Sequence, residues 1–168
     1  YDIEGNAWQN SSLNSLLNNL YYEAKTGSCY INGKVDNCDL SNIGLNDSSK
    51  NRIDKFDIDI DEIDVDGVDD LFKLNPKIEN KTINNVAILS LTDYIKSFNC
   101  QKDVDVCLNN SWLTSGDMLL LTKNKDKYIS IKDDGNIDVS REYTDEFQIK
   151  PIVELKDELY IEKGEGTR

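Results

Sequence analysis

The residues of this chain best suited to chemistry are five aspartates that recur at short intervals. They are Asp57, Asp59, Asp61, Asp64 and Asp66. Calcium takes about six to eight oxygen ligands, and closely spaced carboxylates beside a glycine turn can supply them. From Glu62 to Gly67 the order of the acids follows the first half of an EF-hand loop. The sequence therefore predicts a candidate calcium site here, and calcium is the one cofactor that it suggests.

The same stretch also has a purely structural interpretation. Ile58 and Ile60 alternate with acids, which is typical of a strand with one face in water. Charges on such a strand prevent it from pairing with other chains. The EF-hand match also fails at its twelfth position, where Lys73 replaces the bidentate glutamate. A solvated acidic face and a calcium site are both consistent with the sequence.

Four cysteines form two closely spaced pairs, Cys29 with Cys38 and Cys100 with Cys107. Both pairs lie in polar segments rich in Asn and Asp, and neither has the short Cys knuckle or the histidine partner of a zinc site. Spacing alone does not choose among the possible pairings. Two local disulfides are the simplest interpretation, and they indicate a location outside a reducing cytoplasm.

Most catalytic machinery is excluded by composition. The chain has no histidine, which removes Ser-His-Asp and Cys-His sites. Disulfide bonding would also remove a thiol nucleophile. Two carboxylates about 5–10 Å apart could hydrolyse a glycoside, but nothing singles out one pair among the 32 acids. We therefore expect a protein that is not an enzyme.

Charge and length restrict the partners. The 168 residues carry a formal net charge of −13, which repels phosphate backbones and anionic lipid. No run of about 18 apolar residues is present, so we expect no nucleic acid and no membrane contact by this segment. The abundance of Asn, Ile, Lys and Asp is typical of bacterial proteins from AT-rich genomes. A start at Tyr1 without a signal sequence suggests a mature or trimmed ectodomain.

Hydrophobic spacing predicts the elements of the first half. A helix should begin after Ser11 and Ser12, which can cap it, bury leucines at helical spacing, and end near Ala24. Residues 27–50 read as a long loop with at most a short strand near Tyr30. A strand should follow from Phe56, with a bulge near Glu62.

The second half should be richer in strands. Asn85–Ser90 reads as a buried strand, followed by a helix capped by Thr92. Met118–Thr122 reads as a central strand, and the turn at Gly135 predicts a hairpin. Pro151 should open a last strand. Helices against short strands predict the α+β class.

Two stretches resemble a poorly characterised family of bacterial extracellular domains. AWQNSSLNSLLNNLYYEA has the family's Trp, small polar residues and helix. Ser111–Thr167 has the family's Trp-Leu step at Trp112, a hairpin and a closing strand after Lys150-Pro151. The resemblance implies a C-type-lectin-like fold, similar to that of the formylglycine-generating enzyme, with two helices flanking a small, mostly antiparallel sheet and long loops. Residues 27–84 do not share it, so we expect a single domain, 1–168, with a loop-rich insertion there.

Family members occur on anchored and pilin-like surface proteins, which implies an extracellular binding or adhesion module on a Gram-positive-type bacterium. It could be pilus-associated or a pilin-like subunit, with a host glycan or protein, or other subunits of a surface assembly, as its partner. The alternatives are a structural assembly subunit without its own ligand and a calcium-dependent carbohydrate-active enzyme. No sequence pattern identifies ligand-binding residues. We expect recognition to lie between Gly27 and Asn84, where the resemblance stops.

Overall fold

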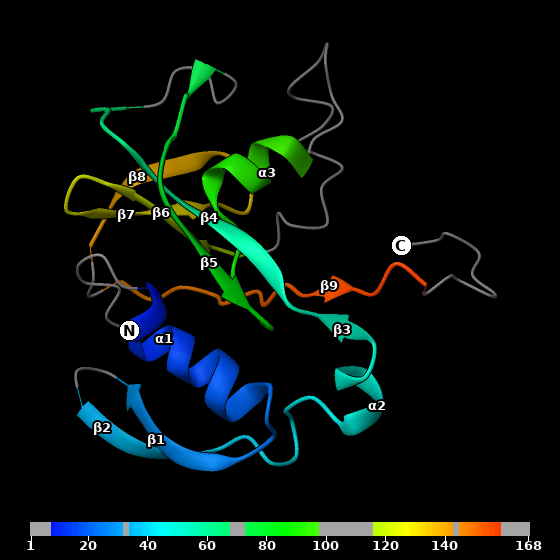
Figure 1. The fold of residues 1–168 in the computed structure, drawn as a ribbon. Helices are drawn as coiled ribbons and strands as arrows, with labels where there is room; N and C mark the ends of the chain where they lie inside the picture. The colour runs from blue at the N-terminus through cyan, green and yellow to red at the C-terminus, as the bar shows by residue number, and fades with distance from the viewer. Residues whose placement is uncertain (1–7, 32–33, 68–72, 98–115, 143–144, 159–168) are drawn as a thin grey trace.

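A five-stranded sheet forms the centre of the molecule. The computed structural model describes residues 8–31, 34–67, 73–97, 116–142 and 145–158. The strands lie in the order β5-β4-β6-β7-β8 (Figure 1). Their bounds are Phe56–Ile63 for β4, Lys77–Asn84 for β5, Met118–Asn124 for β6, Lys127–Ile131 for β7 and Ile137–Arg141 for β8. Only β4 and β6 are parallel neighbours, so the sheet is mostly antiparallel and the predicted α+β class is confirmed.

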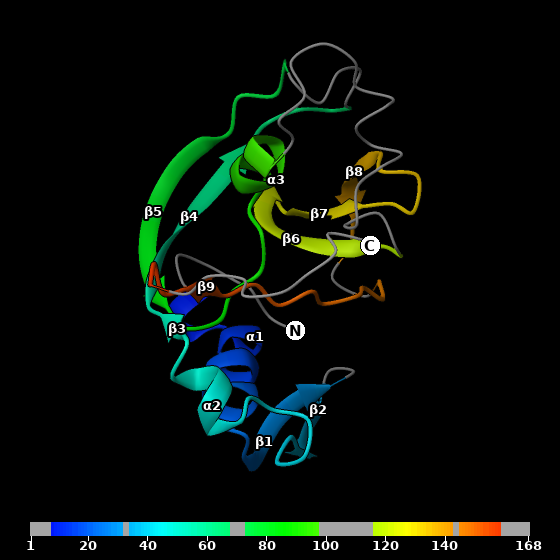
Figure 2. The same cartoon turned by 90° about the vertical axis from the view of Figure 1, so that its right-hand side faces the viewer.

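The middle of the sheet, at β6, is covered on both faces. Successive side chains of a strand point to opposite faces, and β6 shows this directly. Leu119 and Leu121 join one hydrophobic core, whereas Met118 and Leu120 join the other. The N-terminal helix covers the first core and α3 (Leu91–Ser97) the second, on opposite sides of the sheet (Figure 2). Burial on both faces explains why β6 is apolar without alternation.

The N-terminal helix follows its predicted start and buried face. It consists of η1 (Trp8–Asn10), α1 (Ser12–Ser15) and η2 (Leu16–Tyr21), the last with π-helical hydrogen bonding. Ser11 is its cap, because its Oγ accepts a hydrogen bond from the Asn14 amide at 3.0 Å. The predicted apolar stripe is buried, which confirms its role in the core. The helix ends at Tyr21, earlier than predicted.

Residues 85–90 are mostly buried, as expected, but they do not form a strand. Ala87 alone makes a bridge, to Ile152. The Asn18 side chain takes the place of a neighbouring strand at Val86, accepting from its amide at 3.1 Å and donating to its carbonyl at 2.8 Å. Ser90 then caps α3 in place of Thr92, because its Oγ accepts from the Asp93 amide at 3.0 Å.

The expectation of a loop over 27–50 is wrong. The chain forms a hairpin of β1 (Thr26–Ile31) and β2 (Lys34–Asp39), followed by the short helix α2 (Asp47–Lys50). With β3 (Ile53–Asp54), β4 and β5 following, regular elements occupy most of the segment expected to be a loop-rich insertion. The sequence feature that indicates the hairpin is Asn32-Gly33, a dipeptide that favours two-residue hairpin turns.

The C-terminal segment crosses the molecule and joins distant parts. The Leu119 amide donates to the Gln148 carbonyl at 3.1 Å, and Ile152 exchanges two backbone bonds with Ala87. Its strand β9 (Glu154–Leu155) is short and pairs with β3, so the strand predicted after Pro151 is only partly formed. Among the described helices, none is both long and apolar enough to cross a membrane.

Candidate functional site

The aspartates of the candidate calcium site are held by different parts of the structure. Asp59 points from β4 toward two lysines, with its carboxylate 3.2 Å from Lys81 Nζ and 3.8 Å from Lys96 Nζ. Asp64 and Asp66 lie 2.8 and 3.2 Å from Lys125 Nζ, in the turn after β6. Each of these acids thus has a positive partner on another element.

Asp61 is buried and makes hydrogen bonds rather than ion pairs. Its side chain is 2% exposed. Oδ2 accepts from the Thr92 amide at 3.0 Å and from Thr92 Oγ1 at 2.5 Å, and Oδ1 accepts from Thr122 Oγ1. Burial raises the pKa of the Asp61 carboxyl, although these hydrogen bonds oppose the shift. Asp61 therefore joins β4, β6 and the first turn of α3.

Asp57 completes the set and is exposed, without an ion pair to the described residues. Within the described ranges, no three or more acidic or cysteine side chains gather closely enough to hold a metal ion. The contacts of Asp59 and Asp61 explain these two acids as parts of the sheet, and those of Asp64 and Asp66 as ion pairs between the segment after β4 and the turn after β6. Calcium binding by the five aspartates stays a prediction to be tested by measurement.

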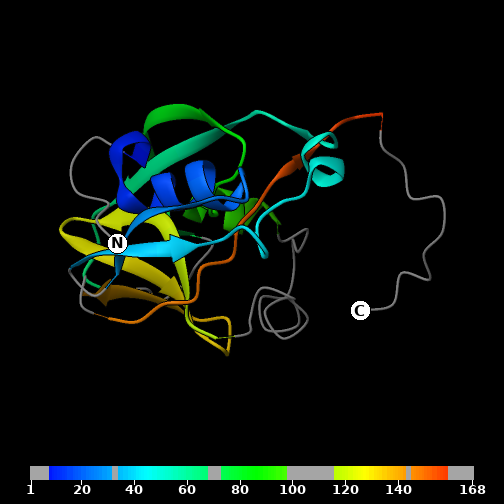
Figure 3. The same cartoon turned by 90° about the horizontal axis from the view of Figure 1, so that it is seen from below.

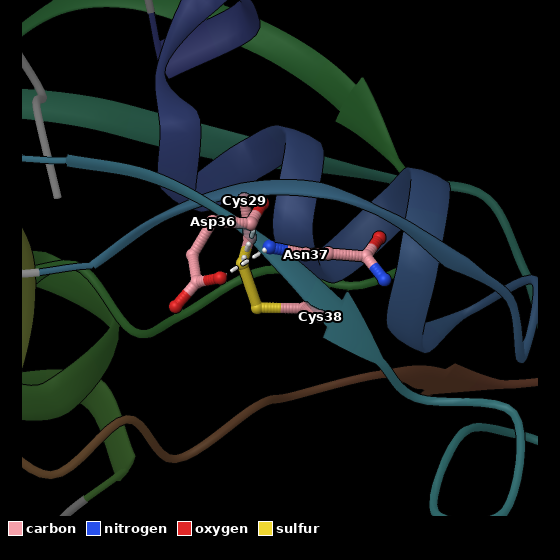
Figure 4. The surroundings of a disulfide bond; sticks show 4 residues. All are labelled: Cys29, Asp36, Asn37 and Cys38. Atoms are coloured by element: carbon pink, nitrogen blue, oxygen red, sulfur yellow. Dashed lines mark hydrogen bonds between the residues drawn. A yellow bond between two sulfur atoms is a disulfide. The ribbon is translucent and has the colours of Figure 1, made fainter.

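The structure confirms one of the two expected disulfides. Cys29 and Cys38 are bonded, with their Cα atoms 5.8 Å apart (Figure 4). They lie on adjacent strands of the hairpin, where Cys29 is opposite Asp36 and Cys38 is opposite Gly27. Cys100, Cys107 and Trp112 lie outside the described residues.

One face of the hairpin, its inner face, packs on the N-terminal helix (Figure 3). Cys29 is 7% exposed. At Gly27 an added Cβ would lie 2.7 Å from Leu20 Cδ2, so a larger residue would displace that leucine. The disulfide and the absence of a side chain at Gly27 thus allow the hairpin to lie close against the helix.

The other face of the hairpin is not covered by any element among the described residues, and we call it the outer face. Its six residues are Thr26, Ser28 and Tyr30 on β1 and Val35, Asn37 and Asp39 on β2. Tyr30 is half-buried and the others are exposed, Val35 to 74%. Tyrosine with serine and asparagine is also the composition that antibody loops use for recognition.

Asp39 has a fixed position at one end of the outer face. Its Oδ1 accepts from Ser41 Oγ at 2.5 Å, from the Ser41 amide at 3.0 Å and from Thr26 Oγ1 at 3.0 Å. These bonds, with those from Ser41 first, lower the pKa of Asp39. Oδ2 accepts no hydrogen bond from the described residues, so an oriented carboxylate oxygen faces solvent.

On the edge of β2 that does not pair with β1, a side chain of the same strand occupies a backbone donor. Asp36 Oδ1 accepts from the Asn37 amide at 2.7 Å (Figure 4). A bond of this kind uses a donor that an added strand would need, which is one way in which proteins protect sheet edges. The outer face is therefore better suited to contact than the edge.

The hairpin lies between Gly27 and Asn84, where we expected recognition, but the residues of its outer face were not predicted. Asn32-Gly33 between two runs of alternating residues could have revealed the hairpin, and the cysteine spacing fits a link across it. No protein-family model, no curated protein and no solved structure matches this chain.

Proposed function

We propose that this chain is an extracellular binding or adhesion module of a bacterial surface protein, and that the outer face of the β1–β2 hairpin is its partner-binding surface. The observation that carries the proposal is the difference between the two faces of the hairpin. The inner face is packed on the N-terminal helix and linked by Cys29–Cys38, whereas the outer face is open to solvent. A link of this kind limits the motion of the strands, so less freedom is lost when a partner binds.

The disulfide also supports an oxidising location, since structural disulfides are rare in a reducing cytoplasm. The C-type-lectin-like fold, the Gram-positive-type surface and the pilus-associated or pilin-like role belong to the same proposal and rest on the resemblance of Trp8–Ala24 and Asn85–Thr167. Within that picture, the hairpin lies in the segment that does not share the resemblance. A surface specific to this chain is expected to occur in such a segment.

The proposal is tested by probing an array of neutral glycans, anionic glycans and extracellular-matrix proteins with the oxidised protein. We expect saturable binding to at least one class. Binding to none of them, together with self-association in sedimentation, would favour an assembly subunit. Turnover of a glycan, dependent on calcium, would favour the carbohydrate-active enzyme.

A further inference from the structure

We propose that the outer face binds an extended, basic segment of a partner protein, with a lysine or arginine at Asp39 and an apolar side chain at Tyr30 and Val35. This inference rests on the proposed function and names the chemistry of its partner. The two ends of the outer face differ in character. Asp39 is the charged end, and the pair of Tyr30 and Val35 is the apolar end.

At the charged end, the structure provides an oriented anion. Three hydrogen bonds hold Asp39 Oδ1, and they leave Oδ2 directed to solvent. A carboxylate that is already held in place loses little freedom when a guanidinium or ammonium group binds to it. The formal net charge of −13 attracts a cationic partner at long range and repels an anionic one.

At the apolar end, Val35 is 74% exposed and lies opposite Tyr30 on the neighbouring strand. A tyrosine beside an exposed aliphatic group forms a contact area for one apolar side chain of a partner. Asp39 and Val35 are four residues apart along β2, which is about 13 Å at about 3.3 Å per residue. In an extended peptide, side chains four residues apart share one face and span the same distance.

The mode of contact also follows from the hairpin. The Asn37 amide is bonded to Asp36, so a partner is expected to lie across the outer face and not to add a strand at the edge of β2. Two strands of this length offer much less than the surface of a stable protein interface, which buries about 1,200 Å² or more in total. We therefore expect weak binding of a short peptide, with a dissociation constant of about 100 μM or higher.

The experiment uses the oxidised protein, labelled with ¹⁵N, and two blocked pentapeptides. Each has leucine at one end and three central threonines, and the other end is arginine in one peptide and glutamate in the second. We expect the arginine peptide to shift the amide signals of Ser28, Tyr30, Val35 and Asn37, and the glutamate peptide to shift none of them. Asp39→Asn keeps the Oδ1 acceptor and removes the charge, so it should weaken binding about two- to fivefold.

Asp54→Asn is the matched control, because it removes one exposed negative charge on β3, outside the hairpin and outside the candidate calcium site. Equal loss in both variants would mean attraction by net charge alone and would overturn the inference. Equal binding of the two peptides would also overturn it. If a neutral glycan on the array shifts the outer face and the arginine peptide does not, the basic segment is wrong and the binding surface stands. If array partners bind away from the hairpin, the proposed surface itself fails.

Discussion

At the scale of single residues, the aspartates of β4 show that a sequence pattern can predict a strand but not the contacts of its side chains. Alternation predicted the strand correctly, but the bulge expected near Glu62 is wrong. Ile58 and Ile63 join cores on opposite faces, as regular alternation requires, and the extra residue of the pairing, Glu79, lies on β5. The partners of these acids were not predictable, since Thr122 lies 61 residues from Asp61 and comes near it only through the pairing of β4 with β6. Local spacing carries no information about such contacts.

Asp61 gives a prediction at this scale. Asp61→Ala leaves the Thr92 amide and two threonine hydroxyls without their buried acceptor, so we expect unfolding to require about 2–3 kcal/mol less free energy. Asp57→Ala, at an exposed position of the same strand, should change it by less than about 0.5 kcal/mol. Urea denaturation of both variants measures the difference. Equal stability of the two would show that the Asp61 network does not support α3.

At the scale of elements, the elements with strong local signals were predicted best. Ser11 caps the first helix, and the turn at Gly135, which has a φ of 80°, joins β7 to β8 as expected. The strand predicted over Asn85–Ser90 does not form, because its backbone partners come from three separate elements. They are the Asn18 side chain at Val86, Ile152 at Ala87 and Leu121 of β6 at Leu89. Burial can be inferred from composition, but the source of the hydrogen bonds depends on tertiary structure.

The open edges of the sheets are also protected by local features. Asp138 on β8 accepts from the Ser140 amide at 3.0 Å, as Asp36 does on β2. On β5 the bulge leaves Glu79 without an opposite residue on β4. Bulges and charges on an edge disfavour the addition of strands from other chains. An assembly of this protein would therefore be expected to use side-chain surfaces.

The disulfide of the hairpin supports a prediction at this scale. Replacing Cys29 and Cys38 together by serine should lower the free energy of unfolding by about 2–3 kcal/mol, because the short loop is no longer closed in the unfolded chain. Ser28→Ala, which alters an exposed residue of the same strand, is the control and should have little effect. Chemical denaturation under non-reducing conditions measures both. An unchanged midpoint in the double variant would show that the link does not stabilise the hairpin.

At the scale of the whole molecule, the class of the fold was predictable from the sequence, whereas the proposed binding surface could be predicted only as a segment, Gly27 to Asn84. Hydrophobic patterns predict which faces are buried, and the two cores on either side of β6 agree with the α+β class. A surface open to a partner leaves no such pattern, because exposed residues are free to vary. The difference between the packed inner face and the exposed outer face of the hairpin is a property of the tertiary structure, and it is this difference that makes the hairpin a candidate binding surface.

Calcium provides a test of the acidic segment in the whole molecule. If the five aspartates bind calcium, the melting temperature should rise by several degrees in calcium relative to a chelator, because a ligand that binds only the folded state stabilises it. Asp64→Asn combined with Asp66→Asn should abolish that rise. If the midpoint is the same with calcium and with chelator, these acids serve the fold alone: Asp59, Asp64 and Asp66 pair with lysines, and Asp61 accepts its buried hydrogen bonds.

The most direct test of the binding surface compares two substitutions on the array. Val35→Lys places a charge on the outer face, and Ile83→Lys places the same charge on β5, where the isoleucine is 66% exposed. Circular dichroism melting should show that both variants remain folded. We predict that Val35→Lys weakens binding to the array partner at least about tenfold and that Ile83→Lys leaves it unchanged. Unchanged binding by Val35→Lys would contradict the assignment of the hairpin as the partner-binding surface.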